Sequence, residues 1–354
     1  MGLGPPVVPT LRSRLPFLDG WRAVAVLIVI MSHVNGFRVE PEYLKVMARW
    51  MPAGQVGVLV FFFISGFVIT RSALAEIDAT QAFSMRAFYI RRAFRIIPPL
   101  CLYLIACLCL GAAGLVNFHL NNAIPAFFFV CNIEPFNQCL WLAGHTWSLA
   151  FEEQFYLLFP AAMAYVLLGR RLFLPHLAGA LVFCLLPLIF PLSYSNRLGF
   201  VLVYGLFGAG VSVAVYEEVV SGLLRKFAPI AFGTSAALIL ITPLTLPWQP
   251  LAFYFPLTFI VTIPVLVLSS GWVGPVSSIL SGGAVRYLGR ISYSIYLWQE
   301  LATSELFNRQ SLPVESVALA GVVVLSAVLF EVMERPLVQL GGRLSRLRMR
   351  LAHA

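Results

Sequence analysis

The stretch FLDGWRAVAVLIVIMSHVNGF, residues 17–37, has the length of a membrane-spanning helix, yet it contains Arg22 and His33. Ionisable groups inside a bilayer are costly and usually have a function. Their separation of eleven residues is almost three helical turns, so both project from one face, ~16 Å apart along the axis. This spacing fits two residues that line one internal pathway. It fits equally a snorkelling arginine and a buried, hydrogen-bonded histidine.

The composition predicts a polytopic, all-α membrane protein. Of the 354 residues, 60% are hydrophobic and 11% are charged, whereas soluble domains have about 25% charged residues. We read residues 1–14 as too short and too rich in proline for a cleavable signal peptide. The net charge of +9 is explained by basic cytoplasmic loops, so we expect no nucleic-acid partner.

Apolar segments of spanning length recur along the chain, and we predict about ten transmembrane helices. The loop 116–145 between the third and fourth spans contains an apolar piece, residues 123–130, that could dip into the membrane. The predicted spans are residues 17–37, 55–73, 96–115, 146–168, 173–191, 197–216, 227–244, 251–268, 288–303 and 315–338.

The distribution of basic residues predicts that both termini are cytoplasmic. With the N-terminus inside, 19 of the 24 Lys and Arg residues fall on the inner side and 5 on the outer side. We therefore expect a cytoplasmic tail at 1–16, a membrane domain at 17–338 and a basic cytoplasmic tail at 339–354 that contacts anionic lipid. In this orientation Arg22 lies near the cytoplasm and His33 toward the outer side.

The second span carries Ser65 and Gly66, and an arginine cluster precedes the third. Ser65 is a possible nucleophile, but a serine that bonds its own or a neighbouring helix fits better because no nucleophile elbow surrounds it. Gly66 would allow close helix contact. Arg86, Arg91, Arg92 and Arg95 either hold the loop inside or bind phosphate, which guanidinium groups match.

Two pairs of residues on the outer side also stand out. Cys131 and Cys139 lie in the outer loop, where they either form a disulfide or remain free. Glu152 and Glu153 begin the fourth span at a depth similar to that of His33. A carboxylate that meets an imidazole orients it as a general base, and the alternative is a purely structural His–Glu pair.

Several segments in order resemble the acyltransferase-3 family of bacterial membrane O-acyltransferases. LDGWRAVAVLIVIMSH is similar to its signature of an arginine, ten residues and a histidine. The similarity covers about residues 15–340. The other segments are GVLVFFFISGFVIT, RRAFRIIPP, WSLAFEEQFYLLFP, LGRISYSIYLW and ERPL.

The resemblance implies transfer of an acyl group, often acetyl, from cytoplasmic acyl-CoA to a glycan hydroxyl at the bacterial inner membrane. His33 would be the base, with Glu152 preferred over Glu153 as its partner. The implied cofactor-binding residues are Arg22, Arg91, Arg92, Arg95 and Ser65, and no metal is implied. The sequence departs from the family at Leu59, where a polar residue is common, and at Gln299, where histidine is common; we expect neither position to belong to the catalytic set.

We therefore expect an acyl-CoA-dependent O-acyltransferase whose partners are membrane lipids and a glycan or lipid-linked saccharide. Direct attack by the acceptor hydroxyl is the simpler route, and an acyl-serine or acyl-histidine intermediate is the alternative. A transporter or flippase for a lipid-linked sugar is a rival interpretation, because intramembrane ionisable residues also mark proton relays. A non-catalytic scaffold and an enzyme that acylates a small secondary metabolite also remain open.

Overall fold

The computed structural model describes residues 15–35, 54–133, 139, 141–169, 194–245, 255–303 and 312–352. Every regular element within these ranges is helical, which confirms the all-α class. The helices are α1 (Pro16–Asn35), α3 (Gly54–Thr80), α4 (Met85–Ala112), α5 (Leu120–Phe127), α6 (Trp141–Gly144), α7 (Thr146–Gly169), α9 (Tyr194–Val215), α10 (Glu217–Lys226), α11 (Ala228–Thr245), α12 (Phe255–Ser269), α13 (Gly274–Leu280), α14 (Gly283–Arg290), α15 (Ser292–Ala302), α17 (Leu312–Leu329) and α18 (Arg335–Ala352).

Four helical stretches in the described part of the chain are long and apolar enough to cross a membrane: Pro16–His33, Gly54–Thr80, Met85–Ala112 and Val314–Arg346. The number rises to six if two bent pairs count as single spans. These pairs are α9 with α10, bent by 92°, and α12 with α13, bent by 95°. The predicted span 173–191 lies outside the described residues. The total of ten spans and the cytoplasmic location of both termini remain predictions.

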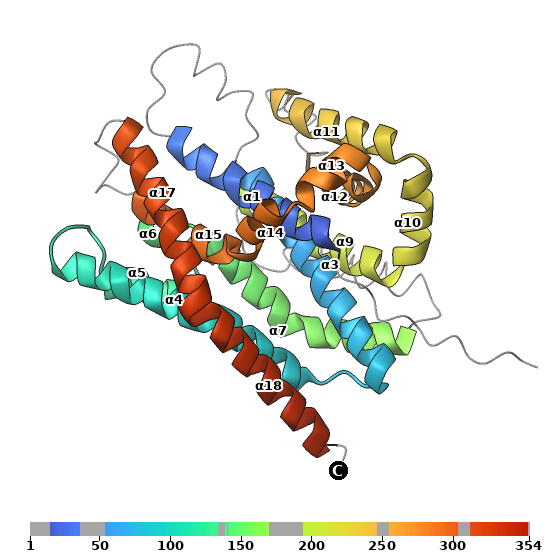
Figure 1. Cartoon of the computed structure of the whole chain (residues 1–354), viewed down its shortest axis with the longest axis horizontal. Coiled ribbons are helices and arrows are strands. Elements are labelled where there is room, and N and C mark those ends of the chain that lie inside the picture. The colour runs from blue at the N-terminus through green and yellow to red at the C-terminus, as the bar shows by residue number, and fades with distance from the viewer. Residues whose placement is uncertain are drawn as a thin grey trace, which may run out of the picture.

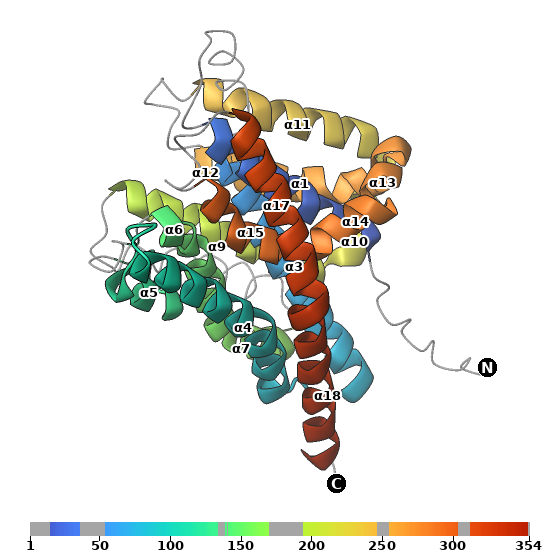
Figure 2. The ribbon, with the colours of Figure 1, turned by 60° about the vertical axis from the view of Figure 1, so that its left-hand side comes forward.

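Two helices are longer than the sequence pattern indicates. Helix α4 begins at Met85 rather than near residue 96, because the Ser84 side chain caps it by accepting a hydrogen bond from the Ala87 amide at 3.2 Å. The arginine cluster is therefore helical. At the other end of the chain, α17 passes through a π-helical turn, Phe330–Glu334, into α18, which continues to Ala352 (Figure 2). The predicted boundary between the membrane domain and the C-terminal tail, at residue 338, thus falls within α18 and remains a prediction.

The predicted span 288–303 is divided. Helix α14 ends at Arg290 and α15 begins at Ser292, with Ile291 between them. Helix α1 packs along both segments and also against α3 and α13 (Figure 1). The backbone of Asp19 meets Gly289 of α14, and His33 meets Gln299 of α15, so α1 runs in the same direction as the α14–α15 segment.

The core is formed where α3 crosses α9, and glycines set how closely the two helices approach. A Cβ atom on Gly66 would lie 2.5 Å from the Phe207 carbonyl oxygen, and one on Gly210 would lie 2.5 Å from the Phe63 carbonyl oxygen. The backbones therefore touch from both sides, as small residues allow in membrane helices. Phe207 fills the space beside this crossing and stacks on Phe155 with ring centroids 4.2 Å apart.

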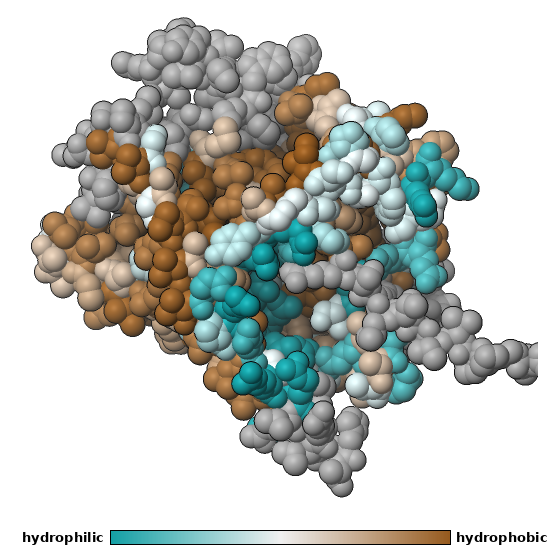
Figure 3. Space-filling view, in the orientation of Figure 1, coloured by the Kyte–Doolittle hydropathy of each residue, from teal (hydrophilic) through white to brown (hydrophobic). Residues whose placement is uncertain are grey.

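The surface separates by polarity in a way that fits a membrane protein. Hydrophobic residues cover much of the face shown in Figure 3, including α17, and hydrophilic residues gather around the lower half of α18 and over α10. The charged residues of α10 explain part of this pattern: Glu217 and Glu218 lie in its first turn, and Arg225 and Lys226 in its last.

We expect Gly66→Ala to destabilise the protein by about 1–3 kcal/mol, because the added methyl group must push two helix backbones apart. Thermal unfolding of the detergent-purified protein would measure this as a lower midpoint. Gly233→Ala in α11 is the matched control, since a Cβ atom there meets no atom within 4 Å. Equal midpoints for the two variants would contradict this account of the α3–α9 contact.

Candidate active site

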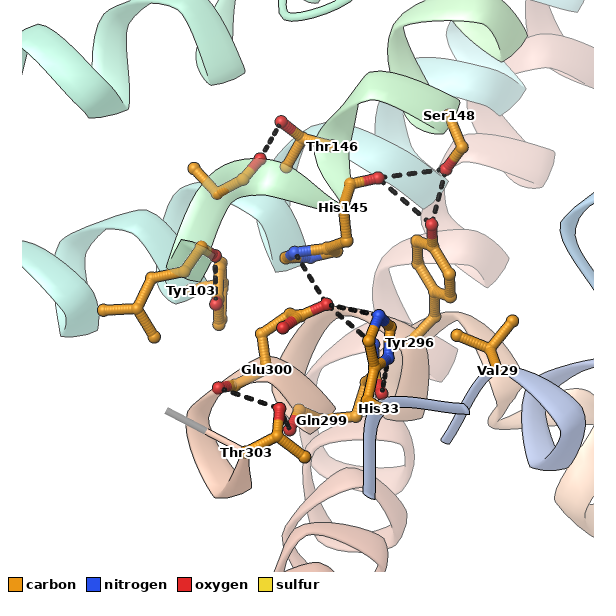
Figure 4. Close-up of polar contacts among 12 residues, drawn as sticks. Val29, His33, Tyr103, His145, Thr146, Ser148, Tyr296, Gln299, Glu300 and Thr303 are labelled. Carbon is orange, nitrogen blue, oxygen red and sulfur yellow. Dashed lines mark hydrogen bonds and ion pairs between the residues drawn. The ribbon is translucent and has the colours of Figure 1, made fainter. Parts of the chain in front are cut away.

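His33, in the last turn of α1, contacts two consecutive residues of α15 (Figure 4). Its Nδ1 lies 3.0 Å from Oε1 of Gln299, and its Nε2 lies 3.4 Å from Oε1 of Glu300. The edge of Trp141 from α6 packs against the ring, with centroids 5.5 Å apart. Three helices thus hold an imidazole that remains partly exposed, with 24% of its side-chain surface accessible.

Glu300 is a carboxylate shared by several nitrogen atoms. Its Oε1 accepts a hydrogen bond of 3.1 Å from the Gln299 amide nitrogen and also lies 4.0 Å from Nδ1 of His145. The residue is 2% exposed, and its Oε2 has no hydrogen-bond partner among the described residues. A buried carboxylate between two imidazoles is costly to maintain, which favours a functional explanation.

His145 lies next to Glu300 and contacts Tyr296. The Tyr296 hydroxyl lies 2.7 Å from Oγ of Ser148, and both hydroxyl groups donate to the His145 carbonyl oxygen at 3.1 Å. His145 is 5% exposed, and neither nitrogen of its ring has a hydrogen-bond partner in the described part of the chain. The ring packs edge-on against Tyr103 and Tyr296.

A disulfide lies next to this group. Cys131 and Cys139 are bonded to each other, which decides between the two alternatives left open by the sequence. The Thr146 hydroxyl donates to the Cys131 sulfur at 3.2 Å, and so links the bridge to the start of α7. Gln154, further along α7, exchanges hydrogen bonds of 2.9 Å with Asn132. The segment that contains the disulfide is thereby tied to α7, which begins directly after His145.

Glu152 lies in a second polar group, and the expected contact between Glu152 and His33 is wrong. Its Oε1 accepts hydrogen bonds from the Ser65 hydroxyl at 2.6 Å and from the Tyr156 hydroxyl. The carboxylate next to His33 is that of Glu300 instead. The reason is depth: His145 lies at the level of His33, because both approach Glu300, whereas Glu152, about two turns later in the chain, lies beside Arg22.

Ser65 also takes a role different from a free nucleophile. Its hydroxyl is engaged by a neighbouring helix, as the structural interpretation expected. Glu153 faces the same region, and its Oε1 is buried without a hydrogen-bond partner among the described residues. Glu152 and Glu153 both line a cavity together with Arg92 and Arg95.

The arginines of α4 divide between two environments. The Arg92 guanidinium lies over the ring of Tyr156, 5.1 Å from its centroid, and Arg95 lines the same cavity. Arg91 points elsewhere and forms an ion pair of 2.7 Å with Glu76 of α3. The structure therefore brings Arg92 and Arg95 to the site and places Arg91 in a contact between α3 and α4.

Three cavities lie among these groups, and Arg22 and Tyr293 line all three. The first is also lined by Ser148 and Tyr296, and the second by Ser65 and the two acids of α7. The third opens among Arg95, Arg290 and Arg335. The first two have volumes of about 40 and 60 Å³, enough for a few water molecules, and the third has about 230 Å³.

The third cavity combines cations with acids. Asp19 and Glu334 line it with four arginines, and Glu334 belongs to the π-helical turn. Such turns are frequent at functional sites. Glu331, in the same turn, forms an ion pair of 2.6 Å with Arg335.

Glu300, Gln299 and His145 were not identified from the sequence as site residues. A signal for Glu300 was present, since it is a carboxylate near the outer end of an apolar span, at the predicted depth of His33. Gln299 was expected to lie outside the catalytic set. Its side chain nevertheless contacts the His33 ring. Leu59 is buried and takes no part in these polar contacts.

Comparison with known families shows the family of the chain. The sequence model of a family described as an acyltransferase domain matches residues 15–332, which is most of the chain. The chain belongs to the acyltransferase-3 family. Its apolar helices and its family together make it a membrane protein of the acyltransferase type.

Family members of similar sequence include O-acetyltransferases of Staphylococcus aureus. O-acetyltransferase OatA of strain NCTC 8325 / PS 47 is 36% identical over 165 residues, which are 43% of this chain and 25% of that protein. A putative O-acetyltransferase of strain COL is 35% identical over 166 residues, 44% of this chain and 25% of that protein. The matched region thus spans a quarter of these curated relatives. No solved structure matches the chain significantly.

We expect Arg91 and Glu76 to be coupled energetically and Arg92 and Glu76 not to be. A double-mutant cycle of Arg91→Gln and Glu76→Gln, measured by chemical unfolding, should give a coupling of about 0.5–1 kcal/mol for this partly exposed pair. The cycle of Arg92→Gln and Glu76→Gln is the control. Equal coupling in both cycles would contradict the ion pair between Arg91 and Glu76.

Proposed function

We propose that this protein is an O-acyltransferase of the bacterial cytoplasmic membrane. It moves an acyl group, in our proposal acetyl, from cytoplasmic acyl-CoA to a hydroxyl of a cell-surface or lipid-linked glycan. The observation that carries the proposal is the group of cavities that share Arg22 and Tyr293 in their linings. They extend from a cavity lined by four arginines to one lined by Tyr296 of α15, the helix whose residues contact His33. The names of the staphylococcal relatives support acetyl as the group transferred.

The arginine end suits an anionic donor substrate. The buried Nε atoms of Arg22 and Arg92 have no hydrogen-bond partner among the described residues, so each has a donor free for a ligand. Guanidinium groups match phosphate oxygens, and Arg95, Arg290 and Arg335 surround the larger cavity. We assign the nucleotide phosphates of acyl-CoA to this opening and its pantetheine arm to the path along Arg22 and Ser65. The narrow first and second cavities must widen to admit that arm.

His33 suits the role of general base. Acyl-CoA supplies an activated thioester, and His33 accepts the proton of the acceptor hydroxyl as the hydroxyl oxygen attacks the carbonyl carbon. The carbon–sulfur bond breaks, and the proton passes on to the departing thiolate, so that an ester and a free thiol result. General-base assistance of this kind contributes about 10²–10⁴-fold in rate.

Glu152 and Glu153 take a different role in this proposal from the one the sequence suggested. They balance the charges of Arg22 and Arg92 within the second cavity, and Glu152 also holds Ser65 and Tyr156 in place. Arg91, which is paired with Glu76, stabilises the contact between α3 and α4 rather than binding the donor.

The catalytic assignment predicts that His33→Ala abolishes acylation in the cell. A strain that lacks the protein would be complemented with wild type, with His33→Ala or with His119→Asn, which changes an exposed histidine at the start of α5. Mass spectrometry of surface glycans and secreted metabolites should show the ester lost only with His33→Ala at equal protein level. An ester at the wild-type level in that strain would refute the role of His33, and undelivered lipid-linked saccharide without ester loss would indicate a transporter.

The donor assignment predicts a separation among the arginines of α4. Binding of CoA to the purified protein should weaken about tenfold or more in Arg92→Gln and in Arg95→Gln, because each loses a charge-assisted hydrogen bond of about 1.5–3 kcal/mol. Arg91→Gln is the matched control from the same helix and should bind within about threefold of wild type. Equally weak CoA binding in Arg91→Gln would indicate that the phosphate site lies nearer to α3 than proposed.

A further inference from the structure

We propose that Gln299 and Glu300 position His33 for proton transfer: Gln299 fixes the tautomer, and Glu300 stabilises the imidazolium that forms. The effect of this arrangement on catalysis rests on the proposed acyl transfer, whereas the contacts from which the arrangement is inferred do not. It assigns a role to two residues of α15 from their contacts with His33 alone (Figure 4).

The orientation of the Gln299 amide follows from its neighbour. Its nitrogen donates to Oε1 of Glu300 at 3.1 Å, so its oxygen faces Nδ1 of His33 at 3.0 Å. An amide oxygen only accepts hydrogen bonds, so Nδ1 must carry a hydrogen atom. In the neutral imidazole the lone pair is then on Nε2, which is the nitrogen available to take a proton from a hydroxyl group.

Glu300 completes the arrangement on the other side of the ring. Its Oε1 lies 3.4 Å from Nε2, close enough to act on that nitrogen and longer than an ordinary hydrogen bond. When Nε2 takes a proton, the imidazolium gains an adjacent carboxylate in a site that is largely shielded from water. An opposite charge at this distance favours the charged form of the ring. The same carboxylate oxygen holds the Gln299 amide, so one oxygen serves both functions.

The helix ends add to this effect. His33 lies in the last turn of α1, and Gln299 and Glu300 lie in the last turn of α15. The carboxyl-terminal end of a helix carries a partial negative charge, and a protonated histidine near it is stabilised. Two helices that run in the same direction thus end at one imidazole.

The remaining charged and titratable groups around His33 are few. His145 lies across the Glu300 carboxylate, 4.0 Å from Oε1, and Tyr103 and Tyr296 pack on its ring. Trp141 covers the His33 ring from α6 without adding a charge. Glu300 is therefore the one carboxylate that pairs with His33 among the described residues.

Three variants test the positioning role in the complete protein reconstituted in lipid nanodiscs. Acyl transfer from acetyl-CoA to a glycan extract shown to be a substrate would be measured as kcat and as KM for acetyl-CoA. Glu300→Gln should lower kcat about tenfold or more with KM within about twofold, and Glu300→Asp should recover part of the loss. Glu315→Gln in α17 removes an equally buried carboxylate and should retain kcat. A normal kcat in Glu300→Gln, or an equal loss in Glu315→Gln, would overturn the role of Glu300.

A spectroscopic test separates this inference from the proposed function. Nitrogen-15 NMR of histidine-labelled protein, with the His33 signals assigned by their loss in His33→Asn, reports which ring nitrogen carries hydrogen. We expect Nδ1–H in wild type and a shift toward the other tautomer in Gln299→Ala. An Nε2–H form in wild type, or a tautomer unchanged by Gln299→Ala, would refute the assignment whether or not acyl transfer is detected. Absence of acyl transfer in wild type with the expected tautomer would refute only the proposed function.

Discussion

The arrangement of this bundle depends on the burial of one guanidinium group, that of Arg22. An unpaired charge inside an apolar helix bundle is strongly unfavourable, so the surrounding helices must supply compensating groups. Asp19 from its own helix and Glu152 from α7 act on it with the opposite charge, and Arg95 from α4 acts with the same charge. The guanidinium keeps polar side chains and small cavities around it, and these make a path through an interior that would otherwise close by apolar packing.

Much of the helical framework and part of the site were predictable from the sequence. Apolar length located α1 and α7 within two residues at each end and the start of α3 within one residue, and Gly66 was recognised as a contact point. The separation of Arg22 and His33 along one helix followed from helical geometry alone. These features depend on local sequence, which is why the sequence was sufficient for them.

The partners across helices were not predictable in the same way. The depth predicted for Glu152 selected it for His33, but the structure places Glu152 beside Arg22, and apolar length does not tell which helix lies beside the outer part of α1. The neighbour at that level is α15, which contributes Glu300. Arg91 illustrates the same limit, because its helical neighbours Arg92 and Arg95 reach the cavity while Arg91 turns to Glu76 on α3. The early start of α4 depended on the Ser84 cap, a signal that the apolar pattern does not contain.

Two carboxylates are needed because the guanidinium of Arg22 and the imidazole of His33 are far apart. Arg22 and His33 are ~16 Å apart along α1, and a single acid between them would stabilise neither charge well. Glu152 serves the Arg22 level and Glu300 the His33 level, and Tyr293 and Tyr296 of α15 line the path between. Because each group has its own carboxylate, the electrostatic balance around Arg22 changes little when His33 gains or loses a proton. In the proposed mechanism, a donor held at the arginine end would be bound before the imidazole changes its charge, as a general base that acts on a second, separately arriving substrate requires.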